Sequence, residues 1–339
     1  MHRKPSSRIS WFLLLLVALG GCERREHLVE QHLLAFGTIV QITLITDDLT
    51  RAEHLLKQIE FQLNEFHHQW HAWEDSDLTR FNQSLLTGQP VTIPASLKPL
   101  LQLSQQFHQQ SDGMFNPALG KLIAAYGFHG QLPDSELIEI IRDDLPRMTD
   151  LIIEGNKAQS LNPHLQIDLG GIAKGYAIGW ISDFLSSHDI ENHIVNAGGD
   201  LAVSGNRFGK PWHIGIQNPG APGAIAGLKL EGKYNLFTSG NYRRQHWLGK
   251  QHLHHIIDPA TGDSSRGQQS ATVLMQDPVA ADVAATVMMI NGARQYEFIS
   301  NDLQIDDFLL VNDLNEIIIS HTMAKKVEFS TNMKVKIVN

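Results

Sequence analysis

Hydrophobic and polar residues alternate over residues 36–46, and many of them are β-branched, which predicts a strand. Over residues 51–70 the apolar side chains recur every three or four positions, the spacing of an amphipathic helix packed on a sheet. A second helix is predicted for residues 94–111. Residues 112–130 are rich in glycine, proline and asparagine and should form an ordered loop with one short helix. A surface helix and a linker are expected over residues 131–150.

The second half of the chain shows short apolar stretches separated by turn residues. The predicted strands cover residues 151–154, 165–169, 193–196, 201–204, 212–217, 226–230 and 236–238. Two helices are predicted at 171–187 and 279–291, and a hairpin should pair residues 308–311 with 316–320. Runs of antiparallel strands with inserted helices favour an α+β fold over a doubly wound sheet. We therefore expect mixed, largely antiparallel sheets with packed helices.

The N-terminus has the pattern of a secretory signal. Basic residues precede an apolar run at 11–19 that is too short for a permanent membrane-spanning helix. The run ends in Leu19-Gly20-Gly21-Cys22, which resembles the lipobox of bacterial lipoproteins and marks Cys22 for lipidation; the alternative is an ordinary signal peptide that stops near a cysteine. This interpretation predicts a signal peptide at 1–21, a polar tether at 22–33 and one domain at 34–339.

The charge and the cysteine content of the chain disfavour some classes of function. The formal net charge is −9, and residues 1–21 carry three basic and no acidic residues, so the mature chain would carry −12. A chain this acidic without a dense basic run is a poor candidate for binding nucleic acid. Cys22 is the only cysteine, so the mature chain can form neither an internal disulfide nor a thiolate metal site. Any metal must be bound by oxygen or imidazole.

A glycine-rich turn follows one predicted strand in the segment IDLGGIAKGYAIG. Gly170-Gly171 would bring backbone amides close to a ligand at the start of a helix, where phosphate is favoured. Lys174 lies in the first turn of that helix, where a cation is poorly placed against the helix dipole, and a bound phosphate would compensate. Such turns are also common in purely structural roles. The segment matches neither the GxGxxG fingerprint nor a P-loop.

The segment AADVAATVMMING places Asp282 and Thr286 four residues apart, on one face of a predicted buried helix. A buried carboxylate and hydroxyl need partners. Thr286 could bond back to the carbonyl of Asp282 while Asp282 caps a neighbouring loop, or the two could bind Mg2+, which prefers oxygen ligands. Histidines at 252, 254 and 255 would point to opposite faces of a strand, which disfavours a zinc site.

Eight segments together resemble the ApbE-type FAD:protein FMN transferase family, in the family's order and across nearly all of the mature chain. They are FGT (36–38), DSDLTRFN (75–82), DGMFNPALG with YGF (112–128), DLGGIAKGY (168–176), NAGGD (196–200), TSGNYR (238–243), HIIDPATG (255–262) and ADVAAT (281–286). One such motif would be weak evidence, whereas eight in order are specific.

The resemblance implies an ApbE-like fold and a set of site residues. Mg2+ would be held by Asp282, Thr286 and the backbone carbonyl of Gly171, and His255 would stand beside the FAD pyrophosphate as a base. The positions that match the family's FAD contacts are Phe36, Met114, Phe115, Asn116, Asp168, Lys174 and Ile257.

Three positions depart from the family pattern. Phe36 replaces a methionine, and Asn116 stands where aspartate is frequent. The flavin-side position before Asp75-Ser76, often tyrosine, is filled by Ala72 or, with a shift of one residue, by Trp73. This position is associated with the balance between transferring FMN and hydrolysing FAD, so the departure leaves the acceptor, protein or water, open.

The expected activity is Mg2+-dependent transfer of FMN from FAD to a Thr or Ser hydroxyl of an acceptor flavoprotein, with release of AMP. The alternatives are a Mg2+-dependent FAD pyrophosphatase that gives FMN and AMP, and a non-catalytic FAD-binding lipoprotein. The resemblance implies acceptors that are periplasm-facing flavoproteins of membrane redox complexes. It also implies a periplasmic, lipid-anchored location, with the inner membrane favoured by the family.

Overall fold

The computed structural model describes residues 25–248, 251–292 and 303–338. Its centre is a sheet in the order β1-β2-β6-β7-β10-β13-β14-β15-β17, whose pairs are all antiparallel except β15–β17. The strands are β1 (His27–Ala35), β2 (Thr38–Thr46), β6 (His193–Ala197), β7 (Asp200–Ser204), β10 (Tyr234–Gly240), β13 (Gln268–Met275), β14 (Asp307–Asn312), β15 (Ile317–Ser320) and β17 (Val335–Val338). The expected mixed, largely antiparallel sheet is confirmed.

Three helices cover one face of this sheet: α1 (Leu49–Trp70), α6 (Ala173–Ser187) and α7 (Pro278–Asn291). Helix α1 begins where the Asp48 side chain accepts a hydrogen bond from the Arg51 N–H at 3.0 Å, an N-cap. The apolar residues that its spacing predicts are buried toward the sheet, whereas α6 and α7 are apolar on most sides and lie deeper. The main hydrophobic core lies between these helices and the sheet.

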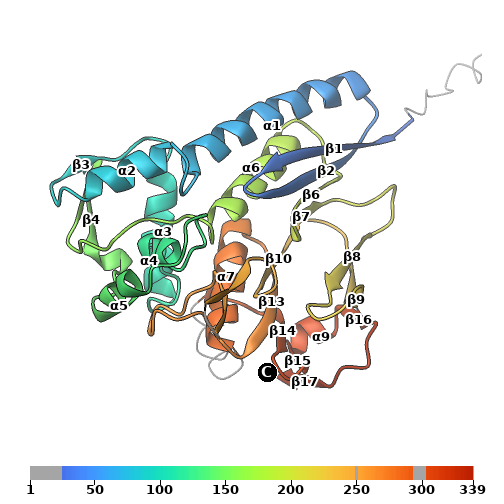
Figure 1. The fold of residues 1–339 in the computed structure, drawn as a ribbon. Coiled ribbons are helices and arrows are strands. Elements are labelled where there is room, and N and C mark those ends of the chain that lie inside the picture. The colour runs from blue at the N-terminus through green and yellow to red at the C-terminus, as the bar shows by residue number, and fades with distance from the viewer. Residues whose placement is uncertain (1–24, 249–250, 293–302, 339) are drawn as a thin grey trace, which may run out of the picture.

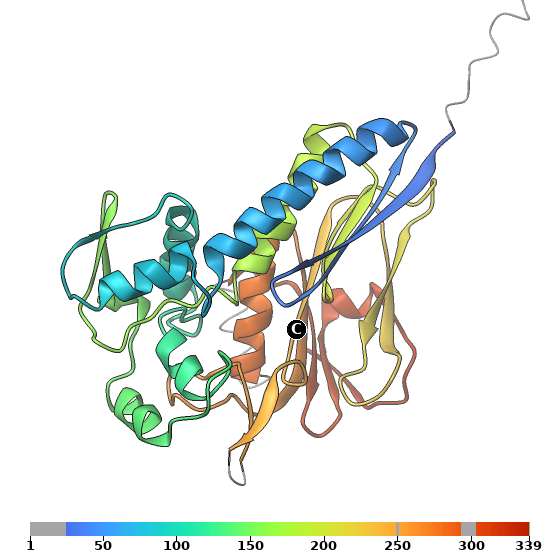
Figure 2. The ribbon, with the colours of Figure 1, turned by 45° about the horizontal axis from the view of Figure 1, so that its top comes forward.

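A smaller sheet covers part of the other face. Its order is β16-β9-β8, formed by β8 (Trp212–Gln217), β9 (Ala224–Leu230) and β16 (Val327–Phe329). A second apolar cluster lies between the two sheets, and the short helix α9 (His321–Ala324) packs nearby. The central sheet is therefore sandwiched between helices and a second sheet (Figures 1 and 2).

A helical lobe extends from the end of α1. It contains α2 (Asp77–Leu85), α3 (Lys98–Gln110), α4 (Gly120–Ala125), α5 (Ser135–Asp143), the short 3-10 helix η1 (Met148–Asp150), and a small sheet of β3 (Val91–Thr92), β5 (Lys157–Ser160) and β4 (Leu151–Glu154). A separate hairpin, β11 (Gln245–Leu248) with β12 (Gln251–His254), approaches the same region. The functional region lies where this lobe meets the central sheet.

Two local predictions were wrong. Residues 27–33 are not a tether, because they belong to β1, which pairs with β2 over nine residues. Because β1 is an edge strand, it carries exposed polar residues such as Glu30 and His32 among its apolar ones. Residues 165–169 are not a strand either, since the Asn82 side chain satisfies both the N–H and the C=O of Ile167, at 2.8 Å each.

The predicted signal peptide and Cys22 lie outside the described residues. Within the ranges that are described, no helix is both long enough and apolar enough to span a membrane.

Candidate active site

A cavity of about 800 Å³ opens between the helical lobe and the ends of β7 and β10, and we call it the main cavity. This volume lies within the range of small-molecule and cofactor sites. The residues predicted from the sequence all line it: Phe36, Trp73, Met114, Phe115, Asn116, Asp168, Gly171, Lys174, His255, Ile257, Asp282 and Thr286. Positions separated by up to 250 residues in the chain are thus brought to one site.

The Gly170-Gly171 turn forms part of the cavity wall immediately before α6. A Cβ atom on Gly171 would lie 3.1 Å from the Phe115 ring and 3.6 Å from the Thr286 hydroxyl, so the absence of a side chain permits the close approach. The Asp168 carboxylate accepts the Gly170 N–H at 2.7 Å, and its other oxygen lies 2.8 Å from Nε2 of His129. Asp168 therefore fixes the shape of the turn.

The pKa of Asp168 reflects the same contacts. Burial would raise the pKa of this carboxyl, but the hydrogen bond and charge of His129, together with the Gly170 N–H, lower it overall. The carboxylate is thus the favoured form at neutral pH.

Lys174 is held by two carboxylates. Its Nζ lies 2.6 Å from Asp200 and 3.0 Å from Asp282. Burial alone would lower the pKa of Lys174, but the charges of the two aspartates outweigh it and raise the pKa. A bound phosphate is therefore not required to compensate this cation, because the protein itself supplies two carboxylates. Two carboxylates and one ammonium leave a net negative charge beside the cavity.

Asp282 also fixes the crossing of α6 and α7. One oxygen of its carboxylate contacts Lys174, and the other accepts the Gly175 N–H at 2.8 Å. A Cβ on Gly175 would lie 2.5 Å from the Pro278 carbonyl, so glycine is required for the helices to approach this closely. Burial and the nearby Asp200 carboxylate raise the pKa of Asp282, against the opposing charge of Lys174.

Thr286 donates to the carbonyl of Asp282 at 3.2 Å, and its hydroxyl lies 3.3 Å from Ser239. The bond from Thr286 to the Asp282 carbonyl that was considered from the sequence is thus present, whereas Asp282 accepts an N–H from the first turn of α6 and not from a loop. They do not preclude cation binding, because the carboxylate and the hydroxyl both retain further lone pairs. With the nearby backbone of Gly171, the residues offer only hard oxygen donors and a net negative charge, which fits Mg2+. Among the described residues there is no cluster of three or more His, Cys, Asp or Glu side chains that could bind a metal.

His255 lies on the opposite wall, after β12. Its Nδ1 lies 3.4 Å from the Arg244 carbonyl, and because a carbonyl can only accept, Nδ1 carries the hydrogen of any bond formed there. Burial and the charge of Arg244 lower the pKa of His255 to about 4. At neutral pH the imidazole is uncharged, and Nε2 keeps a lone pair that can accept a proton.

A sequence profile of the ApbE family matches residues 36–309. The chain belongs to the ApbE family. A FAD:protein FMN transferase of Rhodobacter capsulatus is 31% identical over 309 residues, which are 88% of this chain and 58% of that protein. A FAD:protein FMN transferase of Vibrio cholerae is 29% identical over 314 residues, which are 89% of this chain and 93% of that protein.

Solved structures give the same fold. The crystal structure of the ApbE protein from Thermotoga maritima superposes with a TM-score of 0.80 at 26% identity, covering 88% of this chain and 99% of that one. The flavin transferase ApbE from Vibrio cholerae gives 0.77 at 27% identity, covering 89% and 100%. The predicted family and the ApbE-like fold are confirmed, and the two relatives bear the name of the transferase that the sequence predicts. The chain spans little more than half of the Rhodobacter relative.

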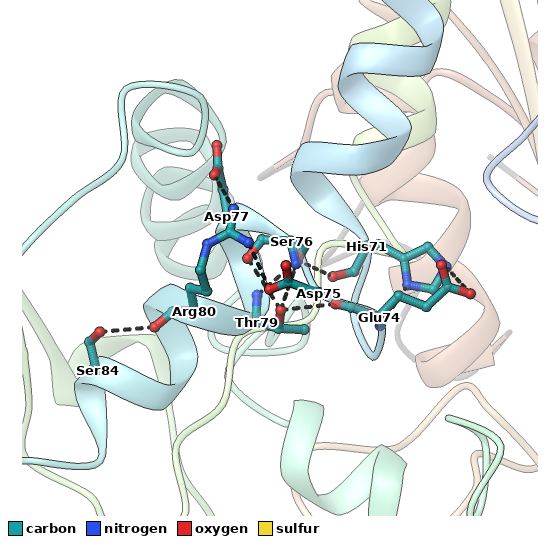
Figure 3. A network of polar contacts seen from close by, with 8 residues as sticks. All are labelled: His71, Glu74, Asp75, Ser76, Asp77, Thr79, Arg80 and Ser84. Carbon is teal, nitrogen blue, oxygen red and sulfur yellow. Dashed lines mark hydrogen bonds and ion pairs between the residues drawn. The ribbon is translucent and has the colours of Figure 1, made fainter.

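A network of polar contacts in the DSDLTRFN segment, shown in Figure 3, adjoins the cavity-lining residues 71–73. Ser76 and Thr79 form a capping box at the start of α2, and Arg80 pairs with Asp75 at 2.7 Å and Asp77 at 2.9 Å. Ser76 also donates to the carbonyl of His71 at 2.7 Å. This network fixes the turn of residues 71–76, which carries both Ala72 and Trp73.

Both residues considered for the flavin-side position, Ala72 and Trp73, line the cavity. The Trp73 ring stacks on His129 with centroids 5.0 Å apart, and the guanidinium of Arg244 lies 5.5 Å from the ring centre. Trp73 remains 41% exposed, so one part of the ring is open to a ligand. The structure thus provides an aromatic surface at the position that the resemblance assigned to the flavin side.

Phe36 adopts a positive φ of 52°, followed by Gly37 at 69°, as the two-residue turn between β1 and β2 requires. Its ring stacks on Trp70 at 6.1 Å. On the far wall Asn116 donates to the Pro146 carbonyl at 2.8 Å and accepts the Ala118 N–H at 3.3 Å, so this amide also holds its own loop. Met114 is half-buried, and Phe115 and Ile257 are buried in the wall.

Sequence reasoning assigned no role to three residues of the site: Asp200, His129 and Arg244. Asp200 is the last residue of the NAGGD segment, and Arg244 directly follows TSGNYR, so the first lay within and the second beside a segment noted in the sequence. His129 had no signal of its own, because its partner Asp168 is 39 residues away in the chain.

Proposed function

We propose that this protein is a Mg2+-dependent FAD:protein FMN transferase that moves FMN from FAD to a Thr or Ser hydroxyl of an acceptor flavoprotein and releases AMP. The observation that carries the proposal is the main cavity, which joins an aromatic surface, a Gly-Gly turn at a helix start and the Lys174–Asp200–Asp282 cluster. The names of the relatives support the same activity. The cavity volume of about 800 Å³ is sufficient for much of a dinucleotide.

Different parts of the main cavity would bind different parts of FAD. The Gly170-Gly171 turn and the start of α6 present backbone amides to the pyrophosphate. Trp73 and Phe36 provide flat apolar contact for the flavin end. Mg2+, when bound by Asp282, Thr286 and the Gly171 carbonyl, would neutralise charge on the phosphates.

His255 is the proposed general base. Its uncharged imidazole accepts the proton of the acceptor hydroxyl as that oxygen bonds to the FMN-side phosphorus. The bond from this phosphorus to the bridging oxygen breaks, and the bridging oxygen leaves as part of AMP. Atoms and charge balance without any oxidant or reductant.

Water in place of the protein hydroxyl would make the same site a FAD pyrophosphatase. The Ala72/Trp73 departure at the flavin-side position is the observation that keeps this alternative. A non-catalytic FAD carrier is less favoured, because simple binding does not need the Asp282–Thr286 pair beside the Gly171 backbone.

The protein would act in the periplasm, attached to the membrane by a lipid on Cys22. Only four residues separate Cys22 from the first residue of β1. At about 3.6 Å per residue, β1 would begin within roughly 18 Å of the anchored cysteine. Such a short connection keeps the enzyme close to acceptor flavoproteins of membrane redox complexes.

The test is to incubate the soluble fragment 23–339 with FAD and Mg2+, with and without a periplasmic flavoprotein domain that bears a candidate acceptor Thr. AMP release and the mass of the acceptor are followed. An acceptor heavier by one FMN unit, matched by AMP and abolished by EDTA, supports the transferase. Free FMN with AMP and no modified acceptor across a panel of such domains would indicate the pyrophosphatase, and intact FAD would indicate a carrier.

A further inference from the structure

A second cavity of about 340 Å³ lies on the face of the central sheet opposite α6 and α7, and we call it the edge cavity. Buried residues on the helix face, such as Ile42, Val195 and Phe237, belong to the main core. Their neighbours in the same strands, including Gln41 and Leu236, line the edge cavity instead. Figure 2 shows the two faces, with the helices on one and β8 and β9 on the other.

One wall of the edge cavity is the face of the central sheet. Alternate residues contribute to it, Gln41 and Thr43 from β2 and Ile194 and Asn196 from β6, as expected when side chains of one face point inward. Three of these four side chains can form hydrogen bonds. The wall is therefore suited to polar groups and is a poor surface for lipid.

The other wall is the edge of a strand. Five consecutive residues of β8, 213–217, line the cavity. Because consecutive side chains point to opposite faces, a cavity that contacts all five meets the strand along its edge. In the sheet of the described residues β8 is the terminal strand and pairs only with β9. Its N–H and C=O groups on the outer side are thus available to another strand.

The edge cavity and the main cavity share two lining residues, Thr238 and Arg243. The Thr238 N–H donates to Asp200 at 3.0 Å, and the other oxygen of Asp200 contacts Lys174. The Arg243 guanidinium lies over the turn between β6 and β7: a Cβ on Gly199 would be 2.7 Å from its Nη2. The edge cavity therefore reaches the phosphate end of the main cavity.

We propose that the edge cavity binds the segment of the acceptor protein that carries the modified hydroxyl, in extended conformation, as a strand added to β8. This inference rests on the proposed transferase function. Backbone hydrogen bonds to β8 would supply sequence-tolerant affinity, and alternate side chains would meet the polar wall of β2 and β6. The hydroxyl would pass Thr238 and Arg243 to reach the FMN-side phosphorus.

The first test fills the edge cavity without changing the main cavity. Gln41→Trp places a large ring on the β2 wall, and His32→Trp is the matched control, because His32 pairs directly with Gln41 in register, is exposed and lines neither cavity. The acceptor is a soluble flavoprotein domain that the wild-type enzyme modifies, as shown by an increase in its mass of one FMN unit. We expect Gln41→Trp to raise the KM for this domain at least tenfold, with the Kd for FAD unchanged and His32→Trp like wild type.

The second test leaves the enzyme intact and covers the case in which Gln41→Trp does not fold. A synthetic ten-residue peptide copied from the modified domain around its hydroxyl is made with N-methyl groups at alternate backbone nitrogens, in two registers. Pairing with β8 requires the N–H groups of one register only, so one peptide series should lose FMN acceptance about tenfold or more and the other should retain it.

The outcomes separate the two proposals. Transfer by wild type, together with unchanged KM in a folded Gln41→Trp or equal activity of both methylated peptides, would overturn the docking site alone. Cleavage of FAD by wild type without FMN transfer to any acceptor domain would overturn the transferase and the docking site together.

Discussion

Lys174 and Asp282 lie 3.0 Å apart, although 108 residues separate them in the chain, and their contact joins the first turn of α6 to α7. The same carboxylate caps the Gly175 N–H, so one side chain fixes a helix crossing and faces the main cavity. A change at Asp282 should therefore affect both the packing of α6 against α7 and the chemistry of the main cavity.

Removal of the Asp282 carboxylate should abolish Mg2+-dependent activity. Asp282→Asn preserves the size of the side chain but removes the charge that a hard cation requires. We expect a loss of turnover of at least about 100-fold and no recovery by millimolar Mg2+, measured by AMP release. A variant that is active and independent of metal would refute the site.

The matched control is Asp277→Asn, on the same helix. Asp277 is exposed and caps α7 through the N–H groups of Val279 and Ala280, without lining the main cavity. This variant should lose up to about 1 kcal/mol of stability and keep its Mg2+ dependence.

His255 should determine the acid limb of the pH profile. His255→Ala should lower turnover by about 10²–10⁴-fold while FAD still binds, whereas His321→Ala, at an exposed position on α9, should behave like wild type. Since the pKa of His255 is lowered to about 4, kcat/KM for FAD in wild type should fall only as the pH drops toward 4 and the base becomes protonated.

Bound FAD should shift this limb. The negative pyrophosphate favours the imidazolium, so the acid limb of kcat should lie at higher pH than the limb of kcat/KM. Acid limbs of kcat and kcat/KM that lie at the same pH would contradict the assignment of His255 as the base. Near wild-type turnover of His255→Ala would contradict it as well.

The fold could be predicted where the residue pattern is determined by one packed face. The spacing of apolar residues in α1 reports burial of one helix face, so this helix could be predicted from the sequence. Strand β2 could be predicted from its alternation and its β-branched residues, although residues 42–46 are buried on both faces of the sheet. Strand β1 was missed because an edge strand exposes much of its polar surface. The segment 165–169 was misassigned because a distant side chain, Asn82, replaces the ladder hydrogen bonds.

The sequence identified individual residues of the site, but it did not show which of these residues contact one another. Local motifs identified Lys174, Asp282 and Asp168, yet no spacing rule relates Lys174 to Asp200 or Asp168 to His129. Such pairs depend on which strands and helices meet in space. For that reason the sequence suggested a phosphate as partner of Lys174 where the fold supplies two carboxylates.

Gly175 should be intolerant of a side chain. In Gly175→Ala the new Cβ would meet the Pro278 carbonyl at 2.5 Å and Cβ of Asp282 at 2.9 Å, so α6 and α7 must separate. We expect a loss of about 1–3 kcal/mol in the free energy of unfolding, despite the better helix propensity of alanine, and reduced turnover because Asp282 moves. Urea unfolding and AMP release measure the two effects.

The control for this substitution is Gly227→Ala in β9, where the nearest neighbour of an added Cβ lies at 3.8 Å, an ordinary contact. It should change neither stability nor turnover substantially. Equal behaviour of the two variants would show that the α6–α7 crossing tolerates expansion.

His193 should make the protein less stable in acid. It is fully buried between Ser182 and the Ile190 carbonyl, each at 2.8 Å, and burial lowers its pKa from 6.5 to about 4. Between pH 6.5 and 4 the unfolded chain binds a proton at this residue and the folded chain does not, so the free energy of unfolding decreases as the pH falls. The loss from this residue approaches about 3 kcal/mol and levels off below pH 4.

Urea unfolding of wild type and His193→Gln between pH 7 and pH 4 isolates this contribution, because the variant lacks the titrating imidazole. Between pH 7 and pH 4 the free energy of unfolding of His193→Gln should therefore fall by about 3 kcal/mol less than that of wild type. Ser182→Ala keeps the imidazole buried and should retain the wild-type slope while lowering stability at every pH. Parallel pH curves for wild type and His193→Gln would mean that the buried imidazole is protonated as readily in the folded protein as in the unfolded chain.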